Sequence, residues 1–297
     1  MISEKFPKVV CFGEILWDVF PTHKVIGGAP LNVALRLHSF GVSVKIISRI
    51  GNDNNGKEAL NYLNEAGLNT DLIQIDEKQN TGYVNVFLDE KGSATYEIFK
   101  PVAWDNIQLN SENQNIVTNT EIFIFGSLAC RSETSKSTLL SLLSEAQYSV
   151  FDVNLRPPDF TMDLIIDLMR RSDFIKLNDE ELEQISDAMG FQNSTVENQV
   201  KQLAELTNTE AICVTKGGDG ALLYYESQFY SNSGYSVTVK DTVGAGDSFL
   251  ASMVLKLLIE KANPEDALDF ACKVGALVAS KEGANAEITK TDFESIT

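Results

Sequence analysis

The chain has 297 residues, of which 43% are hydrophobic, and its formal net charge is −18. A chain of this length can bury a large core as one α/β domain. Its negative charge argues against nucleic acids and anionic membranes as partners. The longest apolar stretch, residues 249–259, contains Ser252 and Lys256 and is too short to span a bilayer. No signal peptide is visible and the four cysteines are far apart, so we expect a cytoplasmic protein with reduced cysteines.

Short apolar runs alternate with amphipathic segments along the chain. Strands are predicted at residues 9–12, 45–49, 122–125, 150–153, 174–177 and 211–215. Helices are predicted at residues 30–40, 56–66, 134–146, 179–189, 196–206, 247–261 and 264–281. This order is typical of a three-layer α/β/α fold with a mostly parallel sheet covered on both faces.

Residues 81–99 depart from this alternation. Apolar residues occupy every second position of two short runs, which flank the sequence Asp89-Glu90-Lys91-Gly92. The period of two and the turn between the runs predict a β-hairpin inserted into the α/β order.

A glycine pair opens the first predicted helix, in the sequence Gly27-Gly28-Ala29-Pro30-Leu31-Asn32. Two adjacent glycines let a ligand approach the backbone closely. Asn32 is the one polar side chain at the start of this helix. The segment is therefore a candidate ligand site.

A second candidate site lies near the C-terminus, where Gly244-Ala245-Gly246 precedes an apolar run with a helical period. Free backbone N–H groups converge at a helix N-terminus and form an anion site. Asp247 is placed to act as a base beside a phosphate held by those amides, as phosphoryl transfer requires. The alternative is that Asp241 and Thr242 only cap the helix and that the glycines only turn the chain.

These two segments, in this order and this far apart, resemble the two signatures of the ribokinase-like, or PfkB-type, carbohydrate kinases. The second departs from the signature only at Ser252, where relatives usually carry Ala or Gly. Further matches cover nearly the whole chain: Gly13-Glu14 with Asp18, Asp152-Val153-Asn154-Leu155-Arg156, Asn178 with Glu181, and Thr215-Lys216-Gly217-Gly218-Asp219-Gly220.

The resemblance implies a ribokinase-like fold with a small β-strand lid. Residues 1–297 would form one kinase domain, and inserted segments at about 15–25 and 80–103 would form the lid. Because such lids are often dimer interfaces in this family, a homodimer through the lid is expected. The alternative for residues 81–99 is an ordinary hairpin at the edge of the sheet.

The resemblance also implies a sugar site. Asp18, Gly28 and Asn32 match family positions that hold sugar hydroxyls, and a carboxylate can accept two hydroxyl hydrogen bonds. Asn154 and Arg156 follow a predicted strand, at the edge where open α/β sheets bind ligands. Their Asp-x-Asn-x-Arg pattern resembles fructokinases and 2-keto-3-deoxygluconate kinases. Lid side chains, Phe99 and Lys100 among them, would decide which sugar binds.

Nucleotide and ion sites follow from the same resemblance. ATP is assigned to Thr215, Lys216, Gly217, Gly220 and Gly246, and Asn178 with Glu181 would organise Mg²⁺ through water. An acidic run at a helix start is also an ordinary N-terminal feature, which is the alternative for Glu181. Many relatives have Asn where this chain has Cys272, which leaves the adenine contact open. Carbonyl groups around Asp241, Val243 and residues 280–284 resemble a K⁺ site of some relatives.

The predicted reaction is the ATP-dependent phosphorylation of a sugar, with fructose as the expected substrate. Asp247 would accept the proton of a sugar hydroxyl while the amides of Gly244, Ala245 and Gly246 stabilise the transferring phosphoryl group. One alternative is 2-keto-3-deoxygluconate kinase, with Lys100 and Arg156 near the substrate carboxylate. The alternative of another class is a catalytically inactive sugar-binding or regulatory protein on the same fold.

Overall fold

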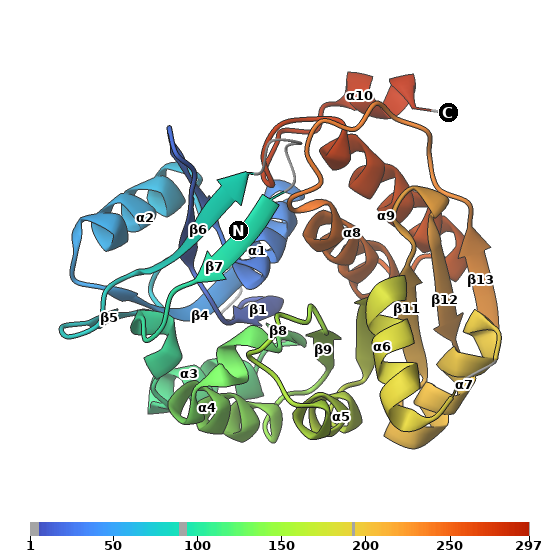
Figure 1. Ribbon diagram of the computed structural model, residues 1–297, viewed down its shortest axis with the longest axis horizontal. Coiled ribbons are helices and arrows are strands. Elements are labelled where there is room, and N and C mark those ends of the chain that lie inside the picture. Colours follow the sequence, from blue (N-terminus) through green and yellow to red (C-terminus); the bar gives the residue numbers. More distant parts are fainter. Residues whose placement is uncertain (1–5, 89–93, 192–193, 297) are drawn as a thin grey trace. The chain divides into compact units, whose positions relative to one another are not determined.

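The computed structural model describes residues 6–88, 94–191 and 194–296 (Figure 1). The chain divides into two compact units. Unit 1 contains the chain up to Phe123 together with Ala129–Gln147, and unit 2 contains Ile124–Leu128 and the chain from Tyr148 onward. Within the described residues, no helix is long and apolar enough to cross a membrane.

Unit 1 contains parallel strands of the main sheet. The strand β1 (Val9–Phe12) is buried along its whole length and pairs in parallel with β4 (Val44–Gly51), which pairs in parallel with β5 (Ile73–Asp76). The strand β1 is a continuous apolar run, as expected of a strand buried in a parallel sheet, whereas β4 and β5 also carry polar residues. The helices of this unit are α1 (Ala29–Ser39), α2 (Asn54–Glu65), α3 (Ser111–Thr118) and α4 (Glu133–Leu143).

Unit 1 also carries a separate four-stranded sheet, which we call the lid sheet. Its strand order is β3 (Lys24–Gly27), β2 (Leu16–Val19), β6 (Gly82–Leu88) and β7 (Ala94–Ile98). The strands β6 and β7 are antiparallel, as the predicted hairpin requires, and β2 pairs in parallel with β6. The predicted turn at Asp89-Glu90-Lys91-Gly92 lies outside the described residues. The predicted small lid is thus a sheet of its own and not an edge of the main sheet.

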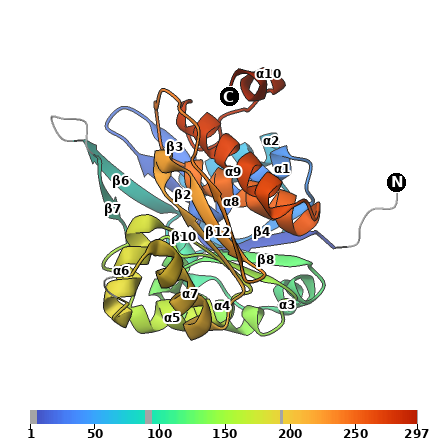
Figure 2. The same ribbon diagram turned by 90° about the vertical axis from the view of Figure 1, so that its right-hand side faces the viewer.

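Unit 2 continues the α/β alternation. The strands β9 (Ser149–Asp152), β10 (Phe174–Asn178) and β11 (Ala211–Thr215) are parallel, whereas β12 (Ala221–Tyr225) and β13 (Gln228–Asn232) are antiparallel to their neighbours. Figure 2 shows helices on both faces of these strands. The helices of this unit are α5 (Met162–Arg170), α6 (Asp179–Met189), α7 (Val196–Thr207), α8 (Ala245–Met253), α9 (Pro264–Ala279) and the short α10 (Lys290–Ser295).

The strand β8 (Ile122–Gly126) belongs partly to each unit, because the boundary follows Phe123. The hydrogen-bonded order in the described part of the chain is β13-β12-β11-β10-β9-β8-β1-β4-β5, a sheet of nine mostly parallel strands. Together with the helices and the lid sheet, this order confirms the predicted fold class.

The structure differs from the predicted elements mainly where helices are short or polar. The helices α3, α5 and α10 were not predicted, and neither were the edge strands β5 and β13. The helix predicted at residues 247–261 begins at Ala245, and its α-helical part ends at Met253 before a π-helical segment, Val254–Ile259. All four cysteines are free and buried, as expected.

Candidate active site

In unit 1, Asp18 lies over the glycine pair. Asp18 of β2 pairs with Val25 of β3, and β3 ends at Gly27. A Cβ atom at Gly27 would lie 2.5 Å from Oδ2 of Asp18, so only glycine leaves room for this carboxylate. Gly28 has a positive φ of 114°, and a Cβ there would lie 2.3 Å from the carbonyl oxygen of Glu14. The two glycines therefore bring the Asp18 carboxylate to the N-terminus of α1.

The first turn of α1 is held by buried polar groups. The N–H of Ala29 donates to Oε1 of Glu14 at 3.3 Å, and Glu14 is only 3% exposed. Pro30 occupies the first turn, where its fixed φ suits a helix and its missing N–H costs nothing. Asn32 is buried in the same turn. The structure thus gathers the predicted sugar residues Asp18, Gly28 and Asn32 at one helix start.

Phe99 and Lys100 follow directly after β7 in the same unit. The ring of Phe99 stacks on Tyr83 with centroids 4.6 Å apart, and its N–H donates to the Tyr83 carbonyl at 3.2 Å. The Phe99 side chain is nevertheless 45% exposed. An exposed aromatic ring followed by an exposed lysine can contact a polar ligand that also has an apolar face.

In unit 2, polar groups follow the carboxyl end of β9. Asn154 has a positive φ of 41°, which asparagine tolerates better than most residues. Arg156 is exposed and its Nη1 donates to the Leu155 carbonyl at 3.0 Å. Both residues lie where ligands of open α/β sheets bind.

Asn178 and Glu181 form a complete capping box at the start of α6. The Asn178 Oδ1 accepts from the Glu181 N–H at 2.7 Å, and Glu181 Oε2 accepts from the Asn178 N–H at 2.9 Å. The other oxygen, Oε1, accepts from the N–H of Leu155 at 2.7 Å. Burial raises the pKa of Glu181 above its ordinary value. Each Glu181 oxygen therefore already accepts one backbone N–H.

Lys176 is a functional candidate that the sequence analysis missed. Its Nζ lies 3.0 Å from Oδ1 of Asp152, and both side chains are almost fully buried. Burial opposes the charge of Lys176, but the carboxylates of Asp152, Glu181 and Asp247 outweigh it, so the pKa of this ammonium group is raised. The sequence feature that could have identified it is a lysine inside the apolar strand sequence FIKLN, because a charged side chain is rarely buried without a partner.

Lys176 also lies near the glycine turn before Asp247. A Cβ at Gly246 would lie 3.2 Å from the Lys176 Nζ, and Gly244 has a left-handed backbone as the N-cap of α8. Because α8 begins at Ala245, Asp247 is the third residue of the helix, where unbonded N–H groups cluster. The N–H of Ala245 already donates to the Thr242 carbonyl at 3.2 Å. The later amides of the first turn are therefore better placed for an anion than that of Ala245.

Asp241 joins the two segments that resemble a K⁺ site. Its Oδ1 accepts from the N–H of Val243 at 3.0 Å, and its Oδ2 accepts from the N–H of Gly283 at 3.0 Å. The described residues contain no group of three or more His, Cys, Asp or Glu side chains that could hold a metal ion. An ion at this site would have to rely on backbone carbonyl groups.

The segment from Thr215 to Gly220 is a hairpin between β11 and β12. The N–H of Lys216 donates to the Gly220 carbonyl at 2.8 Å, which closes the turn. Gly217 has a φ of 54°, and no atom lies within 4 Å of the place its Cβ would take. A Cβ at Gly220 would lie 2.0 Å from the Asn232 carbonyl oxygen. Gly220 is thus needed for the turn itself, whereas Gly217 leaves its backbone open to a ligand.

The predicted site residues divide between the units. Unit 1 holds Asp18, Gly28, Asn32, Phe99 and Lys100, and unit 2 holds the residues from Asn154 to Asp247. Within unit 2, the buried ammonium of Lys176 links Asp152, Glu181 and the turn before Asp247. A base at a helix N-terminus beside a buried counter-charge suits transfer of an anionic group.

Comparisons with known proteins show which family the chain resembles over nearly its whole length. The model of the pfkB family carbohydrate kinases matches residues 3–291. The probable fructokinase-6 of Arabidopsis thaliana, a chloroplastic protein, is 29% identical over 95% of this chain and 80% of its own length. Two solved structures align with a TM-score of 0.82: an uncharacterized sugar kinase from Pyrococcus horikoshii in complex with ATP (27% identity, 93% and 94% coverage) and a fructokinase from Xylella fastidiosa with bound ATP (25% identity, 94% of each chain). The chain belongs to the pfkB family of carbohydrate kinases.

Proposed function

We propose that this protein transfers the γ-phosphoryl group of ATP to a hydroxyl group of D-fructose. The observation that carries the proposal is the position of Asp247 in the first turn of α8, beside the buried Lys176. Fructose is supported by the fructokinase names of relatives at 25–29% identity, and ATP by the two complexes that align with this chain.

Asp247 is the general base of the proposed reaction. It accepts the proton of the sugar hydroxyl, whose oxygen forms a bond to the γ-phosphorus as the bond to the β,γ-bridging oxygen breaks and ADP leaves. The later amides in the first turn of α8 and the positive end of this helix stabilise the charge on the transferring group. Lys176 adds a fixed positive charge below this turn.

The buried carboxylates of unit 2 fit a hydrated Mg²⁺ ion. Among the described residues, Oδ2 of Asp152 is buried without a hydrogen-bond partner, and Glu181 already holds two backbone amides. Glu181 would hold Mg²⁺ through water, consistent with the hydration that this ion keeps in proteins. When bound, Mg²⁺ neutralises charge on the phosphates. A K⁺ ion would bind near Asp241 and Val243.

The nucleotide is assigned to Thr215, Lys216, Gly217, Gly220 and Gly246. The open backbone at Gly217 supports its part of this assignment. The sugar is assigned to Asp18, Gly28, Asn32, Phe99, Lys100, Asn154 and Arg156. Their support is the grouping of the first three at the start of α1, together with the exposure of Phe99, Lys100 and Arg156.

We further propose that residues 1–297 form one kinase domain and that two copies associate through their lid sheets. The strands of the lid sheet come from the two predicted insertions, and β3 and β7 are its edges. Unpaired strand edges invite pairing with another chain. Light scattering coupled to size exclusion tests the dimer, which is refuted by a monomer at assay concentrations.

The function is tested by measuring ADP release with ATP, Mg²⁺ and K⁺ across fructose, 2-keto-3-deoxygluconate, ribose, tagatose and adenosine. Fructose should lead by about tenfold in kcat/KM, which corresponds to about 1.4 kcal/mol of transition-state discrimination. If 2-keto-3-deoxygluconate instead has the highest kcat/KM, Lys100 and Arg156 would be assigned as ligands of its carboxylate. Thermal stabilisation by a sugar without any turnover would instead support an inactive sugar-binding protein.

A further inference from the structure

A buried ion pair lies below the segment that follows the lid hairpin. Arg131, the last residue of the 3-10 helix η2 (Leu128–Arg131), binds Asp105 with two nitrogens: Nε to Oδ1 at 2.6 Å and Nη2 to Oδ2 at 2.9 Å. The Arg131 side chain is 3% exposed, and its guanidinium carbon lies 3.8 Å from the ring centroid of Trp104. A planar guanidinium held by a carboxylate and an aromatic ring has one fixed orientation.

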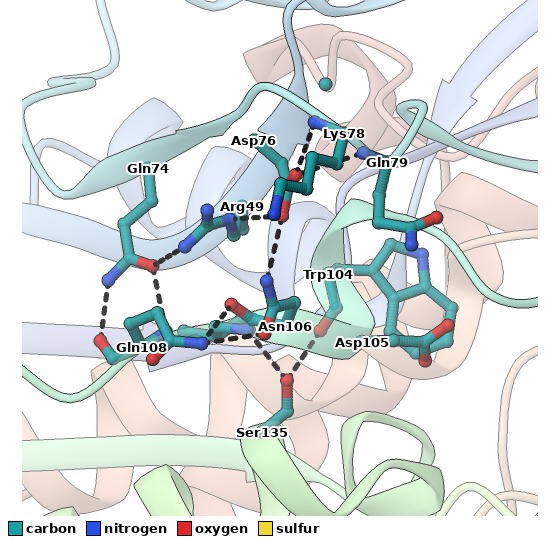
Figure 3. A network of polar contacts seen from close by, with 12 residues as sticks. Arg49, Gln74, Asp76, Lys78, Gln79, Trp104, Asp105, Asn106, Gln108 and Ser135 are labelled. Atoms are coloured by element: carbon teal, nitrogen blue, oxygen red, sulfur yellow. Dashed lines mark hydrogen bonds and ion pairs between the residues drawn. The ribbon is translucent and has the colours of Figure 1, made fainter.

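Asp105 and the short helix that carries it are held by further hydrogen bonds. It lies in the 3-10 helix η1 (Ala103–Asn106), and its Oδ2 also accepts from the N–H of Val102 at 2.9 Å. Figure 3 shows how Ser135 of α4 holds this helix, accepting from the N–H of Ile107 at 2.9 Å and donating to the Trp104 carbonyl at 2.8 Å. Hydrogen bonds to Ser135 therefore connect the helix that carries Asp105 to α4.

Arg131 also contacts the segment that carries Lys100. Its Nη2 donates to the carbonyl oxygen of Phe99 at 2.7 Å. This carbonyl belongs to the peptide bond between Phe99 and Lys100. The N–H and the ring of Phe99 are already held by Tyr83. Arg131 supplies the contact that fixes the peptide plane from which Lys100 departs.

We propose that Arg131 is a positioning residue that sets sugar affinity by orienting Lys100, without touching the sugar itself. The inference rests on the proposed function, in which Lys100 contacts the substrate. A lysine at position 131 would keep the charge but could not bind Asp105 with two nitrogens and also hold the Phe99 carbonyl. All the residues in this relay belong to unit 1.

The test compares Arg131→Lys with Arg49→Lys. Arg49 pairs with the buried Asp76 in the same unit, with 2.8 Å between Nε and Oδ2, and its side chain is 17% exposed. Steady-state kinetics are measured with the sugar that the wild type turns over best. We expect Arg131→Lys to raise the sugar KM about tenfold, with kcat and the ATP KM changed less than about twofold. Arg49→Lys should leave the sugar KM near the wild-type value.

Two further readouts separate positioning from general loss of structure. Amide exchange at Phe99, Lys100 and Val102 should accelerate in Arg131→Lys and not in Arg49→Lys. In a cycle with Lys100→Ala, the two substitutions should be clearly non-additive in the sugar KM, because Arg131 acts through Lys100. If Arg131→Lys does not fold, Asp105→Asn weakens the same pair and should shift the sugar KM in the same direction.

Equal effects of Arg131→Lys and Arg49→Lys on the sugar KM would overturn the inference, as would a joint change of both KM values and kcat. Additive effects in the cycle would overturn it as well. These outcomes leave the proposed function intact, because the wild type still phosphorylates its sugar. A wild-type enzyme that turns over none of the sugars would instead refute the proposed function, and this inference with it.

Discussion

Lys176 and Asp152 form an ion pair in which Nζ and Oδ1 are 3.0 Å apart and more than nine-tenths of each side chain is buried. The pair joins the strands β10 and β9, which are adjacent in the sheet. Asp152 ends its strand, and the Lys176 ammonium group lies near Gly246 at the start of α8. The buried ion pair therefore lies close to the turn that carries the predicted catalytic residue Asp247.

Replacing Lys176 by Met should destabilise the protein strongly. The substitution keeps most of the side-chain length but leaves the Asp152 carboxylate buried without its counter-charge. Breaking a buried pair in this way costs about 3–5 kcal/mol. The free energy of unfolding, measured by urea denaturation, tests this value.

The control for this prediction is Arg171→Ala. Arg171 pairs with Asp167 at 3.0 Å on the surface, with both side chains more than 40% exposed. Exposed pairs contribute about 0–1 kcal/mol. If Lys176→Met cost no more than Arg171→Ala, the pair would not be a significant part of the core.

The sequence alone was sufficient to predict the fold class, because strands and helices alternate with clear periods. It placed the ends of α6 correctly, since Asn178 and Gly190 are strong capping residues at its two ends. The start of α8 was placed two residues late, because Gly246 is a poor helix former and looked like part of the turn. The short helix α10 was missed because six residues give no helical period.

The ion pairs of the site could not be predicted in the same way. Lys176 and Asp152 are 24 positions apart, and Arg131 and Asp105 are 26 apart. Such contacts depend on strand order and on how loops pack, and neither is encoded in local spacing. A single charged residue in an apolar strand, such as Lys176, indicates that a partner of opposite charge lies nearby, but it does not identify that partner.

Asp247→Asn should abolish most of the activity while sugar binding persists. Loss of a general base costs about 10²–10⁴-fold in kcat. The matched control is Asp266→Asn, because Asp266 is the third residue of α9 as Asp247 is of α8. Kinetics of ADP release and calorimetric sugar binding test the pair. Comparable kcat values for the two variants would show that Asp247 is not the general base.

Two glycines of the β11–β12 turn should respond differently to alanine. Both have a positive φ, at 54° for Gly217 and 81° for Gly220, so each alanine carries a backbone penalty of about 1–2 kcal/mol. At Gly220 the new Cβ would also clash with the Asn232 carbonyl, whereas at Gly217 it meets open space. Gly220→Ala should therefore lower the melting temperature further.

The same two variants report on the nucleotide. If ATP approaches the backbone at Gly217, Gly217→Ala should raise the ATP KM severalfold while the sugar KM stays the same. An unchanged ATP KM would place the nucleotide elsewhere. Equal melting temperatures for the two alanine variants would contradict the close packing of Gly220 against β13.

Asp76 should make the stability of the protein depend on pH in acid. Burial opposes its charge, but hydrogen bonds from Asn106, Gln79 and Lys78 and the nearby Arg49 outweigh burial and lower the pKa of Asp76 to about 2 from 3.8 (Figure 3). A depressed pKa adds stability that is complete above the unfolded value and is lost as the pH falls toward the folded value. The difference corresponds to about 2 kcal/mol at neutral pH.

Asp76→Asn should remove this dependence. Urea unfolding at a series of pH values should show that the wild type loses more stability than Asp76→Asn between about pH 4 and about pH 2. Asp167→Asn, which removes a carboxylate from an exposed pair, is the control and should follow the wild-type curve. Parallel curves for the wild type and Asp76→Asn would mean that the hydrogen bonds to Asp76 do not favour its charged form, and that acid unfolding begins at other carboxylates.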